Sequence, residues 1–231
     1  MTKRSLARLA KRAMDVTGAA AGLALCSPAL AVIAVLVRRN MGSPVIFRQT
    51  RPGLGGRPFV LYKFRSMRAP RPDEDRYRSD DQRLTRLGRF LRTTSLDELP
   101  ELWNVLRGDM SLVGPRPLLV EYLDRYTPDE RRRHEVPPGL TGWAAVNGRN
   151  SIPFRERIAL DLWYVDHWSL WLDLRILALT VVKVVRRSDA AATESDPALG
   201  FPLPPPRQPA PPAPEAVGER TGAEGVSARA P

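Results

Sequence analysis

An apolar segment with an interruption at its centre, from Ala13 to Val37, constrains the fold of this chain more than any other feature. Its only charged residue is Asp15. As a helix it would extend about 37 Å, which is enough to cross the hydrocarbon core of a bilayer. Pro28 lies in its middle, directly after Ser27. Proline lacks an N–H and crowds the preceding turn, so the helix should kink or break there, where the Ser27 hydroxyl can bond the released carbonyls.

Basic residues flank this segment on both sides. Five lysines and arginines and no acid precede it within residues 1–12, and nine follow it before the first acid, Asp73. Because basic flanks stay in the cytoplasm, both ends of the segment should lie on that side. A straight span cannot meet this condition, whereas a re-entrant helix–break–helix can. We therefore expect the re-entrant form, with a simple transmembrane span and a secretory signal peptide as the alternatives.

Charge and cysteine content limit the partners and the compartment. The formal net charge is +11, and residues 188–231 contain six acids and three arginines, so residues 1–187 carry about +14. Such an excess indicates an anionic partner, which could be nucleic acid, a phosphorylated small molecule or an anionic membrane surface. The single cysteine, Cys26, excludes an intramolecular disulfide and fits a reducing cytoplasmic setting.

The rest of the chain predicts a compact domain followed by a tail. Residues 45–47 and 59–64 are rich in β-formers and flank the turn sequence RPGLGGRP, so they predict a hairpin. Two short helices follow within residues 84–108, the second ending at Gly108. Residues 188–231 are rich in proline and alanine and have the composition of a disordered tail.

Residues 154–187 predict a long helical region with an unusual surface. Ser169, Asp173 and Thr180 fall on one polar stripe, and most of the remaining surface is apolar. We expect an amphipathic helix in the membrane interface, with Trp163, Trp168 and Trp171 at headgroup depth. An ordinary core helix fits the same pattern.

Two adjacent acids, Asp97 and Glu98, form the candidate catalytic pair. With Ser95 they also match the S-x-x-E capping box, which requires no catalysis. Three arginines favour chemistry instead. Arg92 lies just over one helical turn earlier, Arg116 is held between two prolines, and Arg149 lies in the loop sequence NGRN. Arginines on rigid loops suit bidentate binding of a diphosphate, beside which one carboxylate can attack phosphorus while its neighbour holds Mg²⁺.

Other chemistries have weaker support in the sequence. Asp73 and Asp75 resemble the D-x-D motif of metal-dependent glycosyltransferases, but the motif is short. The only two histidines, His134 and His167, leave little for a Ser-His-Asp triad or a zinc site. We expect no nucleic-acid partner, because the chain contains no helix-turn-helix, RRM or zinc motif.

Several long stretches in order resemble one family, the bacterial sugar transferases, which are monotopic phosphoglycosyl transferases. They include KRAMDV, the Ser27–Pro28 break, PVIFRQTRPGLGGRPFVLYKFRSM, RLGRFLRTTSLDELPELWNVLRGDMSLVGPRP, PPGLTGWAAVNGRN and LDLWYVDHWSLWLDLRIL. They cover roughly residues 11 to 180. The resemblance implies transfer of a sugar-1-phosphate from a UDP-sugar to polyprenyl (undecaprenyl) phosphate with Mg²⁺, at the cytoplasmic face of the inner membrane. This reaction initiates surface polysaccharide synthesis.

The resemblance also assigns roles to residues. It implies that Asp97 is the nucleophile of a covalent aspartyl-phosphosugar intermediate, formed with release of UMP, and that Glu98 binds the metal. Conserved basic residues of the family fall on Lys63, Arg92, Arg116 and Arg149, and its later acids fall on Asp161 and Asp173. The oligomeric state stays open, with a homodimer among the options.

Together these inferences predict an α+β fold, mainly helical, with one small β-hairpin. The expected parts are residues 1–40 as a basic flank and re-entrant helix, residues 41–187 as a cytoplasmic-face catalytic domain, and residues 188–231 as the tail. The expected partners are a UDP-sugar, polyprenyl phosphate and membrane lipids.

Overall fold

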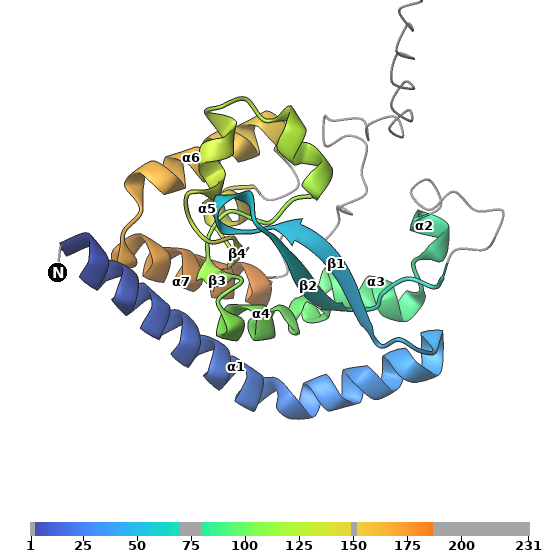
Figure 1. The fold of residues 1–231 in the computed structure, drawn as a ribbon. Helices are drawn as coiled ribbons and strands as arrows, with labels where there is room; N and C mark the ends of the chain where they lie inside the picture. Colours follow the sequence, from blue (N-terminus) through green and yellow to red (C-terminus); the bar gives the residue numbers. More distant parts are fainter. Residues whose placement is uncertain (1–2, 70–79, 149–151, 187–231) are drawn as a thin grey trace, which may run out of the picture.

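A computed structural model describes residues 3–69, 80–148 and 152–186 of the chain (Figure 1). The described part is mostly helical and contains two small two-stranded sheets, which confirms the predicted fold class in outline. Its elements follow in the order α1 (Lys3–Met41), β1 (Ile46–Pro52), η1 (Leu54–Gly56), β2 (Pro58–Phe64), α2 (Asp80–Arg83), α3 (Arg86–Thr93), η2 (Leu96–Glu98), α4 (Glu101–Arg107), β3 (Ser111–Val113), η3 (Val120–Arg125), η4 (Glu130–His134), β4 (Gly139–Thr141), α5 (Trp143–Val146), α6 (Phe154–His167) and α7 (Leu170–Arg186).

The predicted hairpin is present, with a longer first strand than expected. β1 pairs antiparallel with β2 from Ile46↔Phe64 to Pro52↔Pro58. Its turn contains Gly55 and Gly56 at positive φ, the conformation that glycine adopts readily. The buried Asn104 of α4 covers the other edge of β2, since it accepts from Tyr62 N at 3.1 Å and donates to Val60 O at 2.7 Å. These bonds fix the hairpin against α4.

The two short helices of residues 84–108 are also confirmed, and a parallel strand pair follows them. α4 ends at Gly108, whose φ of 90 gives the left-handed cap. β3 then pairs in parallel with β4 through Ser111↔Gly139 and Val113↔Thr141. The sequence analysis missed this pair because each strand has only three residues, too few for an alternating pattern.

α1 is one continuous helix through Pro28, so of the kink or break expected at this residue the break is not present. Figure 1 shows a bend near the middle of α1, with the rest of the domain on its concave side. Pro28 cannot donate to the carbonyl of Ala24, four residues earlier. The Ser27 hydroxyl donates to that carbonyl instead, at 2.8 Å, as the sequence suggested. The released acceptor is thereby satisfied, and the helix can continue past the proline.

The first half of α1 is bonded to the rest of the domain through its charged residues. Lys11 Nζ lies 2.7 Å from the Asp173 carboxylate, and both side chains are buried. Arg12 donates to the carbonyls of Val105 and Leu106 at the end of α4. Asp15, which interrupts the apolar segment, accepts from Ser111 Oγ and Leu112 N at 2.9 Å each. These residues therefore fasten α1 to the domain.

The second half of α1 packs on the same domain through apolar contacts. Ile33 and Val37 form a buried cluster with Phe64 of β2 and Leu91 of α3. Elsewhere α1 exposes large apolar side chains, of which Leu25 is 84% exposed. By length and composition α1 is the one helix among the described residues that could cross a membrane, and only 11% of its most apolar window is buried.

The helical region expected over residues 154–187 divides into α6 and α7. The chain leaves the helical conformation at Trp168, where ψ is 130, and α7 begins at Leu170. The polar stripe of α7 faces the protein. Asp173 is fully buried, and Thr180 Oγ1 lies 2.8 Å from Thr141 Oγ1. The outer face is apolar instead, with Trp171 at 76% exposure.

Candidate active site

Asp97 and Glu98 lie in η2, between α3 and α4, and are almost completely buried, at 7% and 9% exposure. The capping-box interpretation of this pair is wrong. Ser95 has the left-handed conformation, with φ 56, rather than the extended backbone of a capping residue, and α4 begins only after Pro100. Two carboxylates are therefore buried without a capping role to account for them.

Basic side chains converge on this pair from three separate elements. Arg116 Nη2 lies 2.6 Å from Glu98 Oε1, and Lys63 Nζ from β2 lies 3.2 Å from the same oxygen. Arg92, at the end of α3, donates from Nε to Ser66 Oγ at 3.0 Å and acts electrostatically on Asp97. The structure thus brings together Lys63, Arg92 and Arg116, three of the four basic residues that the resemblance singled out.

The environment of Asp97 changes its protonation. Burial raises the pKa of its carboxyl from 3.8 to about 6, and the neighbouring Glu98 charge adds to this rise. Lys63, Arg92 and Arg116 lower the same pKa and only partly offset it. Asp97 is therefore mostly ionised at neutral pH but poorly solvated. A poorly solvated carboxylate surrounded by cations is typical of a reactive group.

Two glycines allow Arg92 and Arg116 to reach the pair. A Cβ on Gly88 of α3 would collide with the carbonyl of Ser66, so only glycine lets α3 pack close enough for Arg92 to bond Ser66. A Cβ on Gly114 would collide with the carbonyl of Pro137, close to the pairing of β3 with β4. The GPRP segment leaves β3 at this point, so the close approach fixes the backbone that carries Arg116.

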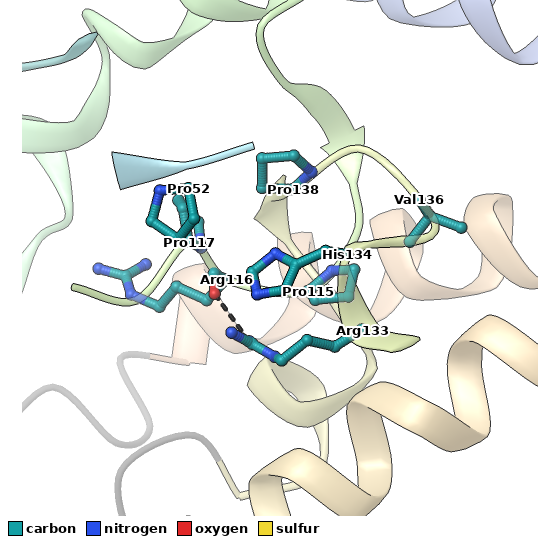
Figure 2. Close-up of a pocket in the computed structure, with 8 residues that line it drawn as sticks. All are labelled: Pro52, Pro115, Arg116, Pro117, Arg133, His134, Val136 and Pro138. Atoms are coloured by element: carbon teal, nitrogen blue, oxygen red, sulfur yellow. Dashed lines mark hydrogen bonds between the residues drawn. The ribbon is translucent and has the colours of Figure 1, made fainter. Parts of the chain in front are cut away.

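Arg133 fixes the backbone of Arg116 by a hydrogen bond to its carbonyl oxygen. Figure 2 shows the Arg116 guanidinium directed away from a small proline-lined pocket, while its carbonyl oxygen accepts from Arg133 Nη2 at 2.9 Å. Asp161 of α6 in turn binds Arg133, at 2.6 Å from Nη2 and 3.2 Å from Nε. Asp161 therefore contacts Arg133. It is linked to the Asp97–Glu98 pair through Arg133 and Arg116.

Asp173 lies where α1, β3 and α7 meet. Its carboxylate accepts from Lys11 Nζ, Tyr164 Oη and Trp168 Nε1, at 2.7, 2.6 and 3.1 Å. These bonds account for a buried charge and give Asp173 a structural task in joining the helices. Three further residues named by the sequence analysis, Asp73, Asp75 and Arg149, lie outside the described residues.

Sequence reasoning missed three buried residues of this region. Glu101 is 2% exposed and places Oε1 3.3 Å from Lys63 Nζ, so Lys63 is shared between two glutamates. Arg133 is 2% exposed and bonds the Arg116 carbonyl. His134 lines the pocket of Figure 2, and burial lowers its pKa to about 4, so it is neutral at pH 7. Both Arg133 and His134 belong to the charged run ERRRH, and nothing local in the sequence marks these two residues as buried.

The donor set can be compared with what Mg²⁺ requires. Among the described residues, no group of three or more His, Cys, Asp and Glu side chains is placed to hold a metal ion. Mg²⁺ often needs only one or two carboxylates, with phosphate oxygens completing its shell. The adjacent carboxylates of Asp97 and Glu98, which repel each other, fit an ion that is shared with a bound phosphate group.

Comparison with known proteins identifies the family of this chain. The family model for the bacterial sugar transferases matches residues 6–187, which include every described element after the first three residues of α1. The chain belongs to the bacterial sugar transferase family. It is therefore an enzyme of the transferase class, and the residues around Asp97 form the candidate active site of a sugar transferase.

The chain is also similar to curated proteins along most of its length. An uncharacterized sugar transferase, EpsL, of Bacillus subtilis (strain 168) is 54% identical over 175 residues, covering 76% of this chain and 87% of that protein. The UDP-glucose:undecaprenyl-phosphate glucose-1-phosphate transferase of Caulobacter vibrioides is 45% identical over 79% of this chain and 72% of its own length. The UDP-galactose-lipid carrier transferase of Erwinia amylovora is 42% identical over 79% of this chain, which spans only 42% of that relative.

Proposed function

We propose that this sugar transferase moves a sugar-1-phosphate from a UDP-sugar to polyprenyl (undecaprenyl) phosphate and releases UMP. One observation carries the proposal. Lys63, Arg92 and Arg116 converge on a buried carboxylate pair in which the Asp97 pKa is raised to about 6. The relatives from Caulobacter and Erwinia, named for transfer from UDP-glucose and UDP-galactose to a lipid carrier, support the substrate classes.

The first chemical step forms a covalent intermediate. An oxygen of the Asp97 carboxylate attacks the β-phosphorus of the UDP-sugar, the one that bears the sugar. The bond from this phosphorus to the oxygen bridging the two phosphates breaks, and UMP leaves with that oxygen. Arg92 and Arg116 lie where they can neutralise phosphate charge as it develops. Burial assists the attack because a poorly solvated carboxylate has less water to displace.

The second step regenerates the enzyme. An oxygen of the polyprenyl phosphate attacks the phosphorus of the aspartyl-phosphosugar, and the bond between this phosphorus and Asp97 breaks. The product is a lipid-linked diphosphosugar, and the Asp97 carboxylate is free again. Glu98 would hold Mg²⁺ together with the substrate phosphates, and the ion, when bound, supplies Lewis-acid stabilisation of phosphate charge. Lys63 and Arg116 hold the Glu98 carboxylate in place for this task.

We also infer that α1 enters and leaves the cytoplasmic leaflet of the inner membrane. Two sets of contacts support this disposition, with Lys11, Arg12 and Asp15 bound to the domain near one end and Ile33 and Val37 near the other. In a straight span these two groups would lie about 33 Å apart across the bilayer. One domain could not then contact both without entering the hydrocarbon. The bend at the middle of α1 instead lets Leu25 reach deepest.

α7 is a candidate for a helix that lies in the membrane interface, because its outer face is apolar. Trp171, Val181 and Val184 are 76%, 63% and 57% exposed, while Asp173 and Ile176 are fully buried. An apolar outer face with a tryptophan near one end suits the boundary between headgroups and acyl chains. The substrate lipid phosphate would lie at this same boundary, which places the acceptor beside the domain.

Product identity tests the proposal against its rival. Membranes that contain the protein are incubated with a panel of UDP-sugars, with and without undecaprenyl phosphate, and the released nucleotide is identified by chromatography. We expect UMP together with a lipid diphosphosugar. Release of UDP would support a metal-dependent glycosyltransferase, the alternative based on Asp73 and Asp75.

A further inference from the structure

Arg157, in the first turns of α6, is a cation that the contacts of the structure leave unaccounted for. Its Nε and Nη2 atoms are shielded from solvent and have no hydrogen-bond partner among the described residues. Unpartnered buried donors are rare in proteins, and they are most costly on a group that keeps its charge. Such donors call for an explanation, and an anion that binds them is one that the surroundings of Arg157 can test.

The side chain is held in a defined position despite this lack of partners. Its guanidinium carbon lies 5.9 Å from the centroid of the Phe154 ring, which in turn packs 5.4 Å from the Tyr122 ring. A guanidinium stacked on a ring keeps its edge, with the N–H donors, available for an anion. Phe154 is buried, so the platform is part of the core.

The surrounding charges point to an anion. Arg116 and Arg133 both act on Arg157 unfavourably, and Asp161 is the one acid among its main electrostatic neighbours. Arg133 already binds the Asp161 carboxylate through two nitrogens, and Arg116 binds the Glu98 carboxylate. Three guanidinium groups thus share two carboxylates, and Arg157 is the one left over.

We propose that Arg157 binds a phosphate group of a substrate, beside Arg116, at the edge of the active site. The guanidinium fork would bind phosphate oxygens bidentately, as arginine does in many phosphate sites. The choice of phosphates rests on the proposed function, which offers two sources. One is the diphosphate of the nucleotide sugar, and the other is the phosphate of the polyprenyl acceptor.

Direct binding to the full chain in detergent or nanodiscs tests this inference. The probes are UDP with Mg²⁺ and, separately, undecaprenyl phosphate in mixed micelles. The variants are Arg157→Gln, Arg157→Lys and a matched control, Arg155→Gln, which removes an exposed arginine two residues away on the same helix. We expect Arg157→Gln to weaken one probe by about tenfold or more, because a charge-assisted bond is lost. Arg157→Lys should recover part of the loss, and Arg155→Gln should bind both probes normally.

If Arg157→Gln binds UDP more weakly, Arg157 binds the diphosphate of the nucleotide sugar. If the variant binds undecaprenyl phosphate more weakly, Arg157 binds the phosphate of the acceptor. The melting temperature without ligand distinguishes a structural role. Arg157→Gln should melt at or above the wild-type temperature, because it removes the two shielded N–H groups of a half-buried guanidinium that have no partner among the described residues. Normal binding of both probes by Arg157→Gln would overturn the inference, whether or not the variant melts lower.

The outcome stays separate from that of the proposed function. If the wild type binds UDP but releases no UMP from any UDP-sugar, the proposed function fails, and the binding difference at Arg157 still decides this inference. If the wild type transfers sugar phosphate while Arg157→Gln binds both probes normally, the inference alone fails.

Discussion

Lys11 of α1 and Asp173 of α7, 162 positions apart in the sequence, form a buried ion pair with an N–O distance of 2.7 Å. Lys11 also donates to the Val113 carbonyl at 3.0 Å, so one side chain links α1, β3 and α7. The long N-terminal helix and the rest of the domain are thus joined by a charged contact in the protein interior.

Removal of Lys11 should therefore destabilise the whole protein. Lys11→Met leaves the Asp173 carboxylate buried without its cation, which typically costs about 3–5 kcal/mol. Thermal melting in detergent measures the loss, with Arg8→Met as the control because Arg8 lies on the same helix and is exposed. The double variant Lys11→Met, Asp173→Asn should recover part of the loss. A Lys11→Met protein that melts like Arg8→Met would contradict this account of the ion pair.

The disposition of α1 is testable by cysteine labelling. Single cysteines replace Ser5 and Ser43 in a Cys26→Ser background, so each probe differs from the native residue by one atom. Because both ends of α1 contact one domain, we expect reagents to reach both positions from the cytoplasmic side only. Labelling of either position exclusively from outside would show that α1 spans the membrane.

Pro28 should matter for the same reason. Pro28→Ala restores an N–H donor to the Ala24 carbonyl and removes the cause of the bend. A straighter α1 cannot keep both of its ends on the domain, so position 43 or position 5 should become accessible from the opposite side in a fraction of the molecules. An unchanged labelling pattern in Pro28→Ala would show that packing alone imposes the bend.

Glu98→Gln tests the proposed metal site. The amide keeps the size of the side chain but weakens Mg²⁺ binding, so UMP release should fall by orders of magnitude and recover in part at raised Mg²⁺. Glu156→Gln, an exposed glutamate on α6, serves as the control. Full activity of Glu98→Gln at low Mg²⁺ would remove Glu98 from the proposed site.

Asp97→Asn should stabilise the metal-free protein. The folded state holds the Asp97 pKa at about 6 against 3.8 in a model peptide, so between these values it binds more protons than the unfolded chain. This contribution to stability is present at low pH and is lost as the pH rises through about 6. In EDTA at pH 7.5 the variant should be more stable by up to about 3 kcal/mol, and the difference should vanish near pH 4.

A capping role predicts no such gain in stability. Asparagine caps a helix about as well as aspartate, so Asp97→Asn would then keep nearly the wild-type stability at every pH. Melting curves of both proteins at pH 4, 6 and 7.5 therefore separate a buried reactive acid from a structural one.

Local signals in the sequence predicted local structure well. The glycines and prolines of RPGLGGRP placed the hairpin, and Ser27 with Pro28 predicted both the distortion of α1 and the bond that relieves it. Arg92 and Arg116 were linked to the Asp97–Glu98 pair by their own positions in the sequence. Lys63 came from the family resemblance alone, since it lies on β2 and no spacing rule connects it to the pair.

Long-range contacts escaped the sequence analysis. The charges of Lys11 and Arg12 suggested membrane topology, whereas Asp15 was only the single charge of the apolar segment. The contacts by which these three residues bind α1 to β3, α4 and α7 depend on partners about 90 or more positions away. The buried state of Arg133 and His134 has the same origin, because packing of η4 against α6 buries a run that is locally polar.

The covalent intermediate on Asp97 is the central claim, and mass spectrometry tests it most directly. Wild-type protein is incubated with UDP-sugars in the absence of lipid acceptor, digested, and analysed beside Asp97→Asn. We predict release of at most one UMP per enzyme molecule and the added mass of a sugar phosphate on the peptide that contains Asp97, with neither in the variant. An adduct on another residue, or UMP formed only when the acceptor is present, would contradict the account.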